Sequence, residues 1–198
     1  MINKIKKRIK SFKAIPPEKN LPQAAVLIAL TNEKDPKILY TLRSNKLSSH
    51  SGEVSFPGGK YEEGDENLVD TALRESHEEI GLKRSEVNIL GSLDSMVSRF
   101  NISVTPFVGI ISKETKTNSD SEEIEVCFKV PLSFLLDDKR LRNDAVRRGN
   151  ETFYVPAYSF KTYVIWGLTA MITVNFLNLA LEAGIDLKKP EEILGEKE

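Results

Sequence analysis

The segment FPGGKYEEGDENLVDTALRESHEEIGL, Phe56–Leu82, predicts one amphipathic helix held between two glycine turns. Asp65 can cap the start of the helix, which runs to about Ile80, and Gly81 is placed to end it. At about 100° per residue, one stripe of the helix must face a core. The stripe consists of Val69, Ala72, Leu73, Ser76 and Ile80.

The rest of the chain supplies strands for this helix to cover. QAAVLIAL (Gln23–Leu30) and KILYTLRS (Lys37–Ser44) read as two strands joined by a polar turn. Strands alternate with two substantial helices, which predicts the α/β class with a mixed sheet covered on both faces. The other expected elements are strands in Val87–Ser98 and Ile102–Ser112, a strand running into a short helix in Glu123–Leu136, a hairpin in Arg148–Phe160 and a long helix from about Thr162.

Composition favours a single domain in a reducing compartment. The 198 residues carry Lys+Arg 28 against Asp+Glu 29, a net charge of −1 that lacks the basic excess of a nucleic-acid binder. The single cysteine, Cys127, excludes an internal disulfide. We expect a domain over 21–186, a basic N-terminal extension over 1–20 and a charged tail over 187–198.

Neither terminal helix predicts membrane insertion. MINKIKKRIKSFK lacks a continuous apolar core, and Ile2, Ile5, Ile9 and Phe12 are spaced for a short surface helix that packs on the domain. Thr162–Leu181 carries no charge, but its threonines and asparagines favour a buried helix over a membrane span. We therefore expect no stable membrane insertion and a cytoplasmic location, although the Lys-rich N-terminus leaves the location open.

The glutamates of the first helix are candidate metal ligands. Glu75, Glu78 and Glu79 lie three and four residues apart, so they project together beside the core stripe. Their repulsion costs roughly a few tenths of a kcal/mol per pair, so a solvated acidic face stays open on energy alone. The preceding Gly58-Gly59 turn lets the backbone approach a ligand closely, which favours Mg²⁺ bridged to a phosphorylated ligand.

The segment R-E-S-H-E-E-I-G-L, Arg74–Leu82, resembles the Nudix box, G-x5-E-x7-R-E-U-x-E-E-x-G-U, where U is a bulky aliphatic residue. Ser76 replaces one aliphatic residue. Six residues rather than five follow Gly59 before Glu66, so either Asp65 or Glu66 takes the first acidic position. The resemblance implies a Nudix-like α/β/α sandwich and metal binding by the box glutamates Glu75, Glu78 and Glu79.

A second resemblance concerns LYTLRSNKLSSHSGEVSFPGG, Leu39–Gly59, which is similar to the signature of the coenzyme A pyrophosphatase branch of Nudix hydrolases. Tyr40 replaces an aliphatic residue of that signature, and Ser48 stands where an arginine is usual. The likeness extends over about Leu27–Leu181. It implies hydrolysis of coenzyme A, or its acyl derivatives, to 3′,5′-ADP and 4′-phosphopantetheine (or its acyl form), with Mg²⁺ or Mn²⁺ as the metal.

The resemblance also assigns roles to individual residues. Glu79 and Glu123 are the candidates for general base, with Glu123 alternatively an extra metal ligand. Arg74, four residues before Glu78, can hold that carboxylate and is counted with the catalytic residues. The expected substrate-binding residues are Arg43, Ser44, Gly58 and Gly59, with Lys46, Arg99, Arg147 and Arg148 as weaker candidates for phosphate contacts.

Other conspicuous residues have simpler interpretations. His50 and His77 show no metal spacing, Cys127 reads as a small core residue, and Trp166 reads as helix packing rather than an adenine platform. The expected partner is a small-molecule substrate, and a homodimer is left open. Two alternatives also remain: hydrolysis of another nucleoside diphosphate derivative, such as NADH, ADP-ribose or a damaged nucleoside triphosphate, and a Nudix-fold binding module without turnover.

Overall fold

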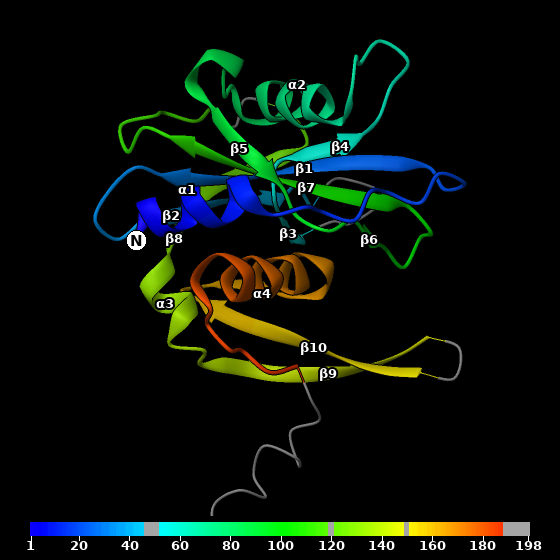
Figure 1. Ribbon diagram of the computed structural model, residues 1–198, viewed down its shortest axis with the longest axis vertical. Coiled ribbons are helices and arrows are strands. Elements are labelled where there is room, and N and C mark those ends of the chain that lie inside the picture. The colour runs from blue at the N-terminus through cyan, green and yellow to red at the C-terminus, as the bar shows by residue number, and fades with distance from the viewer. Residues whose placement is uncertain (46–51, 119–120, 149–150, 188–198) are drawn as a thin grey trace, which may run out of the picture.

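The computed structural model describes residues 1–45, 52–118, 121–148 and 151–187. Figure 1 shows α2 (Leu68–Ile80) on one face of a large sheet and α4 (Gly167–Leu181) on the other. A second, smaller sheet lies on the far side of α4. The predicted α/β class, with a mixed sheet between helices, is confirmed.

The large sheet is built on one parallel pair of strands. β1 (Gln23–Thr31) and β7 (Ser103–Ile111) pair in parallel from Gln23 opposite Ser103 to Thr31 opposite Ile111. The other pairings in this sheet are antiparallel. They involve β2 (Lys37–Arg43), β3 (Val54–Ser55), β4 (Gly58–Lys60), β5 (Asn88–Ser92), β6 (Met96–Val97) and β8 (Ile124–Pro131).

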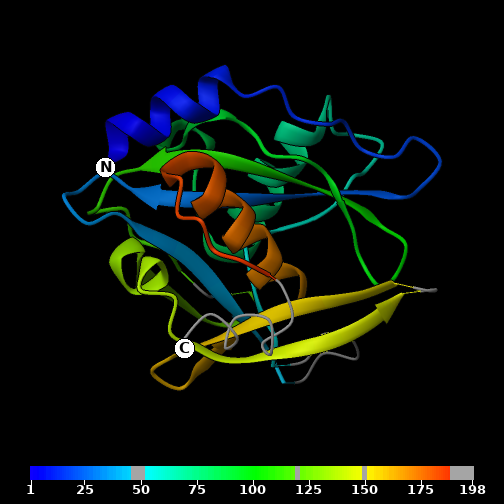
Figure 2. The ribbon, with the colours of Figure 1, turned by 60° about the horizontal axis from the view of Figure 1, so that its bottom comes forward.

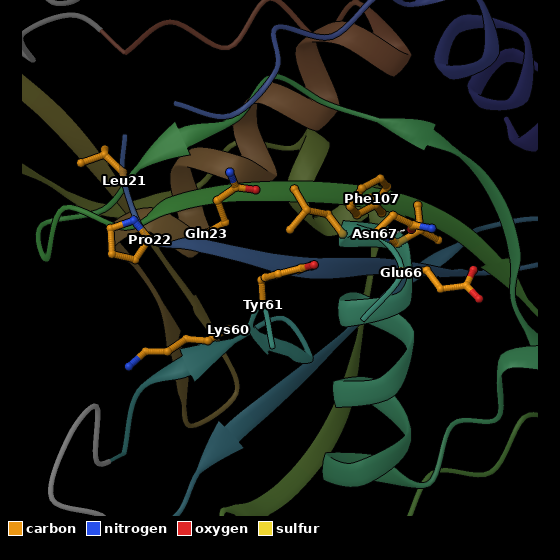
Figure 3. A pocket seen from close by; sticks show the side chains of 10 residues that line it. Leu21, Pro22, Gln23, Lys60, Tyr61, Glu66, Asn67 and Phe107 are labelled. Carbon is orange, nitrogen blue, oxygen red and sulfur yellow. Dashed lines mark hydrogen bonds between the residues drawn. The ribbon is translucent and has the colours of Figure 1, made fainter. Parts of the chain in front are cut away.

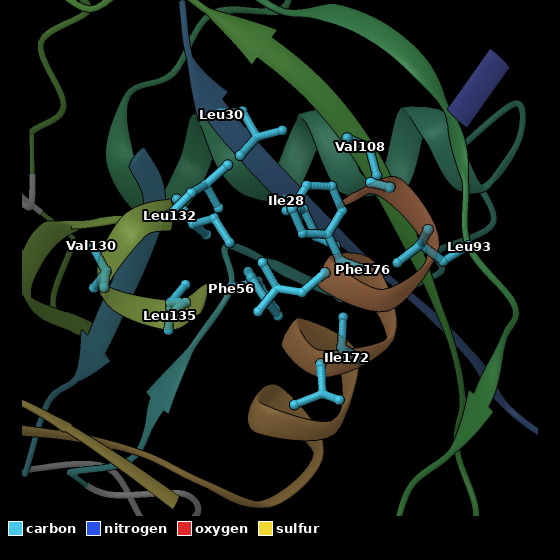
Figure 4. Packing of buried hydrophobic residues seen from close by; sticks show 14 of the residues in the cluster. Ile28, Leu30, Phe56, Leu93, Val108, Val130, Leu132, Leu135, Ile172 and Phe176 are labelled. Carbon is cyan, nitrogen blue, oxygen red and sulfur yellow. The ribbon is translucent and has the colours of Figure 1, made fainter. Parts of the chain in front are cut away.

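β1 separates two hydrophobic cores because successive side chains of a strand point to opposite faces. Leu27 and Ala29 pack in the cluster beneath α2, whereas Ile28 and Leu30 pack in the cluster beneath α4. Figure 4 shows Ile28 and Phe176 of α4 pointing into the same space. A strand buried on both faces has no polar alternation, which explains the continuous apolar run of its sequence.

The predicted helix over the large sheet forms, with one correction at its start. Asn67 rather than Asp65 is the N-cap, since its Oδ1 accepts hydrogen bonds from the N–H groups of Val69 (2.9 Å) and Asp70 (3.1 Å). Asp65 is buried and points to other partners. Gly81 ends the helix in the left-handed conformation, with φ of 67°, as predicted.

The C-terminal half departs from the sequence-based elements in two places. The hairpin is formed by β9 (Arg140–Arg148) and β10 (Glu151–Phe160), so its first strand lies upstream of the predicted segment. β9 reads RLRNDAVRR, which lacks the apolar alternation expected of a strand. Thr162 does not begin the long helix, because β11 (Tyr163–Ile165) continues the small sheet before α4 starts at Gly167.

Two short helices complete the fold. α3 (Leu132–Leu136) follows β8 as predicted, and a turn of 3₁₀ helix, η1 (Arg84–Glu86), follows α2. The sequence of α4 carries no charge. Within the described ranges, no helix has both the length and the apolar character needed to cross a membrane.

The N-terminal basic segment folds as α1 (Ile2–Ser11) and packs as predicted on the domain. Ile2, Ile5 and Ile9 are buried in the cluster beneath α4. The Nζ of Lys4 donates to the carbonyl of Leu181 at 3.0 Å, which ties α1 to the end of α4. Figure 2 shows the two helices side by side. The segment therefore contributes to the core.

Replacing Ile5 with Ala is expected to lower the free energy of unfolding by roughly 2–5 kcal/mol, because the substitution removes a fully buried side chain from a packed cluster. Chemical denaturation of the variant and the parent measures the difference. Lys7→Ala on the exposed face of the same helix is the control and should change stability by less than about 0.5 kcal/mol. Equal effects of the two substitutions would contradict the packing role of α1.

Candidate active site

Arg74 in the middle of α2 organises the acidic cluster. Its Nε donates to Asp65 Oδ1 at 2.8 Å and its Nη2 to Asp65 Oδ2 at 3.1 Å, a bidentate pair. Nη1 donates to Glu75 Oε1 at 3.1 Å and to Glu78 Oε2 at 3.2 Å, and Nη2 also donates to the carbonyl of Lys60 at 3.1 Å. Every N–H of the guanidinium is thus engaged, so Arg74 acts here as a positioning residue.

Asp65, rather than Glu66, takes the acidic position of the loop before α2. Asp65 also accepts hydrogen bonds from the hydroxyl of Thr71 (2.8 Å) and the N–H of Glu62 (3.1 Å), while Glu66 is exposed. The hydrogen bonds from Arg74 hold the pKa of the Asp65 carboxyl well below its usual range, despite burial. The same pairing raises the pKa of Arg74.

Glu79 is the most buried carboxylate of the cluster, with 5% of its surface exposed. Its Oε2 accepts a hydrogen bond from the N–H of Gly58 at 3.1 Å, and its Oε1 accepts one from Arg43 Nη1 at 3.4 Å. Burial raises the pKa of Glu79 to about 7, although Gly58 and Arg43 oppose the rise. The charges of Glu75 and Glu123 raise it further, so negative potential converges on this point.

Two glycines let β4 run close to these carboxylates. Gly58 has φ of +147°, and a Cβ there would lie 2.3 Å from the carbonyl oxygen of Ala25. A Cβ on Gly59 would lie 2.4 Å from the carboxyl carbon of Glu75. Any larger residue would therefore displace the sheet or the carboxylate. Gly58 and Gly59, expected to bind substrate, here support Glu79 and Glu75.

Arg43 joins the helix carboxylates to a second acidic segment. Its Nη2 donates to Glu123 Oε2 at 3.2 Å, and the N–H of Ser44 donates to the carbonyl of Glu123 at 2.7 Å. The pairing of β2 with β8, with Arg43 opposite Ile124, sets this contact. Within the described residues, the buried Nε of Arg43 has no hydrogen-bond partner. The structure thus brings Arg43, Ser44, Glu79 and Glu123 together.

The donor set fits a hard divalent cation. Carboxylate oxygens are the ligands that Mg²⁺ and Mn²⁺ prefer, and Glu75 and Glu79 are close enough for each to disfavour the other's charge. In the described ranges, no three His, Cys, Asp or Glu side chains are already arranged around one point. The carboxylates of α2 form ion pairs with arginines: Arg74 pairs with Glu75 and Glu78, and Arg43 pairs with Glu79. Ligation would require these carboxylates to turn from their arginines.

Two of the weaker cationic candidates, Arg99 and Arg147, lie within the described residues and have other surroundings. Arg99 pairs with Glu53 at 3.1 Å and lies over the ring of Phe100, 4.8 Å from its centroid. Arg147 is exposed on β9. Lys46 and Ser48, which bear on the coenzyme A signature, lie outside the described residues, as do the side chain of Arg148 and His50.

The structure agrees with the sequence-based interpretation of some conspicuous residues and corrects that of Trp166. His77 is exposed. Cys127 is half-buried beside the cluster beneath α2, and burial raises the pKa of its thiol. Trp166 corrects the sequence-based interpretation, because it precedes α4 in an extended conformation instead of packing within a helix.

Two pockets went unpredicted, because each is lined by segments distant in sequence. One, of about 940 Å³, lies at the N-terminal end of α2, and Figure 3 shows Tyr61 and Phe107 among its lining residues. The other, of about 690 Å³, is lined by parts of β2, β8, β9 and β11 together with Trp166. Leu42 and Asn45 line the second pocket and lie within two residues of Arg43 on the chain.

Comparisons with a family model and with known proteins all point to the Nudix family. The family model of the NUDIX domain matches residues 21–148. The chain is 39% identical over 168 residues to "Nudix hydrolase 15, mitochondrial" of Arabidopsis thaliana, with 81% of this chain and 59% of that protein covered. It is 36% identical over 166 residues to "Uncharacterized Nudix hydrolase NudL" of Enterobacter sp. (strain 638), with 84% and 85% covered.

A solved structure shares the fold. The crystal structure of a MutT/nudix family protein from Enterococcus faecalis superimposes with a TM-score of 0.55 at 16% sequence identity. The match covers 86% of this chain and 66% of that one. At this identity the likeness concerns the fold alone.

Replacing Asp65 with Asn is expected to lower the free energy of unfolding by roughly 1.5–3 kcal/mol at neutral pH, because the bidentate pair with Arg74 is lost. The folded-state pKa of Asp65 is depressed, so its contribution is present above the unfolded value near 4 and is lost as pH falls below it. Denaturation curves of parent and variant should therefore converge in acid.

Glu66→Gln is the matched control, one residue away and exposed. It should change stability by less than about 0.5 kcal/mol at either pH. If Glu66→Gln lowered the free energy of unfolding more than Asp65→Asn, Glu66 rather than Asp65 would take the first acidic position of the box.

Proposed function

The chain belongs to the Nudix hydrolase family, and from this premise we propose that it hydrolyses the diphosphate bond of coenzyme A or its acyl derivatives, with Mg²⁺ or Mn²⁺ bound at the glutamates of α2. The products are 3′,5′-ADP and 4′-phosphopantetheine, or its acyl form. One observation carries the proposal of turnover. Arg74 holds Glu75 and Glu78, Arg43 holds Glu79 and Glu123, and Gly58 and Gly59 of β4 lie against Glu79 and Glu75.

The choice of coenzyme A rests on the segment that leads into β4. Leu39–Gly59 resembles the signature of the coenzyme A pyrophosphatase branch, and it places Arg43 beside the carboxylates. Since Arg43 contacts Glu79, its charge suits the diphosphate itself better than the distant 3′-phosphate. Selection for coenzyme A therefore needs additional contacts, and we expect it to be modest because Ser48 replaces the usual arginine.

The chemistry is attack of water on phosphorus. A bound divalent cation neutralises the charge of the diphosphate and lowers the pKa of water. Arg43 contributes a second positive charge at the same place. Its pairing with Glu79 and Glu123 keeps the guanidinium aimed at the cluster, so substrate phosphate can exchange with a carboxylate as its partner.

Two carboxylates are placed to take the proton of that water. Glu79 is buried against Gly58, and Glu123 is exposed on the other side of Arg43. We propose Glu123 as general base and Glu75, Glu78 and Glu79 as metal ligands, with the roles of Glu79 and Glu123 exchanged as the alternative. The non-catalytic module is disfavoured because Glu75, Glu78 and Glu79 are all present.

The location and the assembly of the protein stay predictions. We propose the cytoplasm, as composition indicates, although the name of the Arabidopsis relative places that protein in mitochondria. We propose no nucleic-acid partner, and a homodimer stays open.

Glu78→Gln and Glu79→Gln are each expected to lower kcat at least about a hundredfold, because metal charge stabilisation contributes several kcal/mol to the barrier. Glu123→Gln should lower kcat by about a hundredfold or more if it is the base. The distinguishing measurement is kcat against Mg²⁺ concentration. Excess metal should partly restore the variants of the ligands but not that of the base.

Glu63→Gln, in the loop before α2 and exposed, is the control and should retain the parent's kcat. If Glu78→Gln or Glu79→Gln retained near-full activity at saturating Mg²⁺, that glutamate would not be a ligand. Partial restoration of Glu123→Gln by metal would instead make Glu123 the extra ligand.

Coenzyme A is expected to have a higher kcat/KM than dephospho-coenzyme A, NADH and ADP-ribose. The reason is that the segment Leu39–Gly59 resembles the signature of the coenzyme A pyrophosphatase branch. The advantage should be at the lower end of the roughly ten- to hundredfold that one charge-assisted contact provides. Steady-state assays of these four substrates with Mg²⁺ and with Mn²⁺ test this. More efficient cleavage of NADH or ADP-ribose would refute the coenzyme A assignment and leave the family unchanged.

A further inference from the structure

The pocket of about 690 Å³ lies where the ends of β2 and β8 meet β11 and the start of α4. We propose that it binds the adenine base of the substrate, stacked on Trp166. This inference rests on the proposed function, because coenzyme A, NADH and ADP-ribose all carry adenosine on one side of the diphosphate. It adds the site that recognises that half of the substrate.

Trp166 presents an aromatic ring to this pocket. The residue has φ of −149° and ψ of −177°, so it stands before the first turn of α4 and is only half-buried. The guanidinium of Arg99 lies 5.9 Å from the centre of its ring, and Glu53 holds that guanidinium at 3.1 Å. A fixed indole on the wall of a pocket offers a stacking surface for a flat heterocycle.

The polar groups beside Trp166 match an amino-substituted purine. Glu125 and Asn45 line the same pocket, and the side-chain amide of Asn45 donates to Glu125 Oε2 at 3.4 Å. A carboxylate accepts hydrogen bonds from the exocyclic amino group of a base, and an amide can pair with the N6 and N7 edge of adenine. A keto group at the same place would be repelled by Glu125. These polar groups also suit a base better than an apolar acyl chain.

The pocket is placed to share one ligand with the carboxylate cluster. Leu42 and Asn45 flank Arg43 on the chain, and Glu125 follows Glu123 by two residues. Side chains alternate along β2, so Leu42 packs beneath α4 while Arg43 turns to Glu79. A ligand with its base on Trp166 would pass over the end of β2. Two residues of strand span about 7 Å, a distance that an adenosine covers.

The first experiment uses fluorescence, because Trp166 is the sole tryptophan of the chain. The full-length protein is titrated with 5′-AMP, 5′-IMP and ribose 5-phosphate in the absence of divalent cations. We expect a saturable change with AMP and none with ribose 5-phosphate. IMP should bind about tenfold more weakly, and Glu125→Gln should bring the AMP and IMP affinities to within about twofold, because an amide can also donate.

No change with AMP, or an equal change with ribose 5-phosphate, would overturn the proposal. So would an AMP preference that is unaltered in Glu125→Gln. These measurements need no turnover, so they can fail while the diphosphate is still hydrolysed. Conversely, stacking of AMP could be observed in a protein whose preferred diphosphate is not coenzyme A.

The second experiment measures kinetics with coenzyme A. Trp166→Ala should raise KM by about tenfold or more with a smaller change in kcat, since base–aromatic stacking is lost. Trp166→Phe retains an aromatic face and should recover most of the affinity, which separates stacking from a folding defect. Phe100→Ala is the matched control, an exposed aromatic residue beside Arg99 but outside the pocket. Unchanged KM in Trp166→Ala, or an equal rise in Phe100→Ala, would refute base stacking at this position.

Discussion

The contact on which the site depends is the bidentate pair between Arg74 and Asp65. It fixes the guanidinium between α2 and the loop before it, at Nε···Oδ1 2.8 Å and Nη2···Oδ2 3.1 Å. The remaining N–H groups then set Glu75 and Glu78, and one also binds the backbone of β4 at Lys60. A single side chain thereby places two carboxylates and the glycine strand relative to one another, and offsets repulsion that the helix alone would leave uncompensated.

The sheet supplies the second constraint. β1 is buried on both faces and divides the interior into a cluster beneath α2 and another beneath α4. The same alternation on β2 sends Arg43 toward Glu79 and Leu42 toward α4. The two faces of one strand therefore have different surroundings: the charged cluster of Arg43 and Glu79 on one side, and on the other a pocket lined in part by Tyr163 and Arg142 of the small sheet.

Local patterns in the sequence were sufficient for α2, for β1 and β2, and for the row of glutamates, because each depends on spacing within one segment. They were insufficient where a contact decides between neighbours. Either Asp65 or Glu66 can take the first acidic position of the box on the chain, and only the contact with Arg74 distinguishes them. β9 was missed because its pairing with β10, rather than apolar alternation, makes it a strand. The sequence predicts Trp166 within the long helix because β11, with only three residues, is too short to interrupt the uncharged run from Thr162.

The arginines give the site a charge balance that depends on what is bound. Arg43 contacts Glu79 and Glu123, yet its buried Nε has no acceptor within the described residues. A buried donor without a partner is costly. A diphosphate would provide acceptor oxygens, and a cation at Glu79 would replace the positive charge that Arg43 supplies there. A cation at Glu79 and a diphosphate at Arg43 would therefore favour each other's binding, because each would take over one of the charges that Arg43 and Glu79 hold in the protein alone.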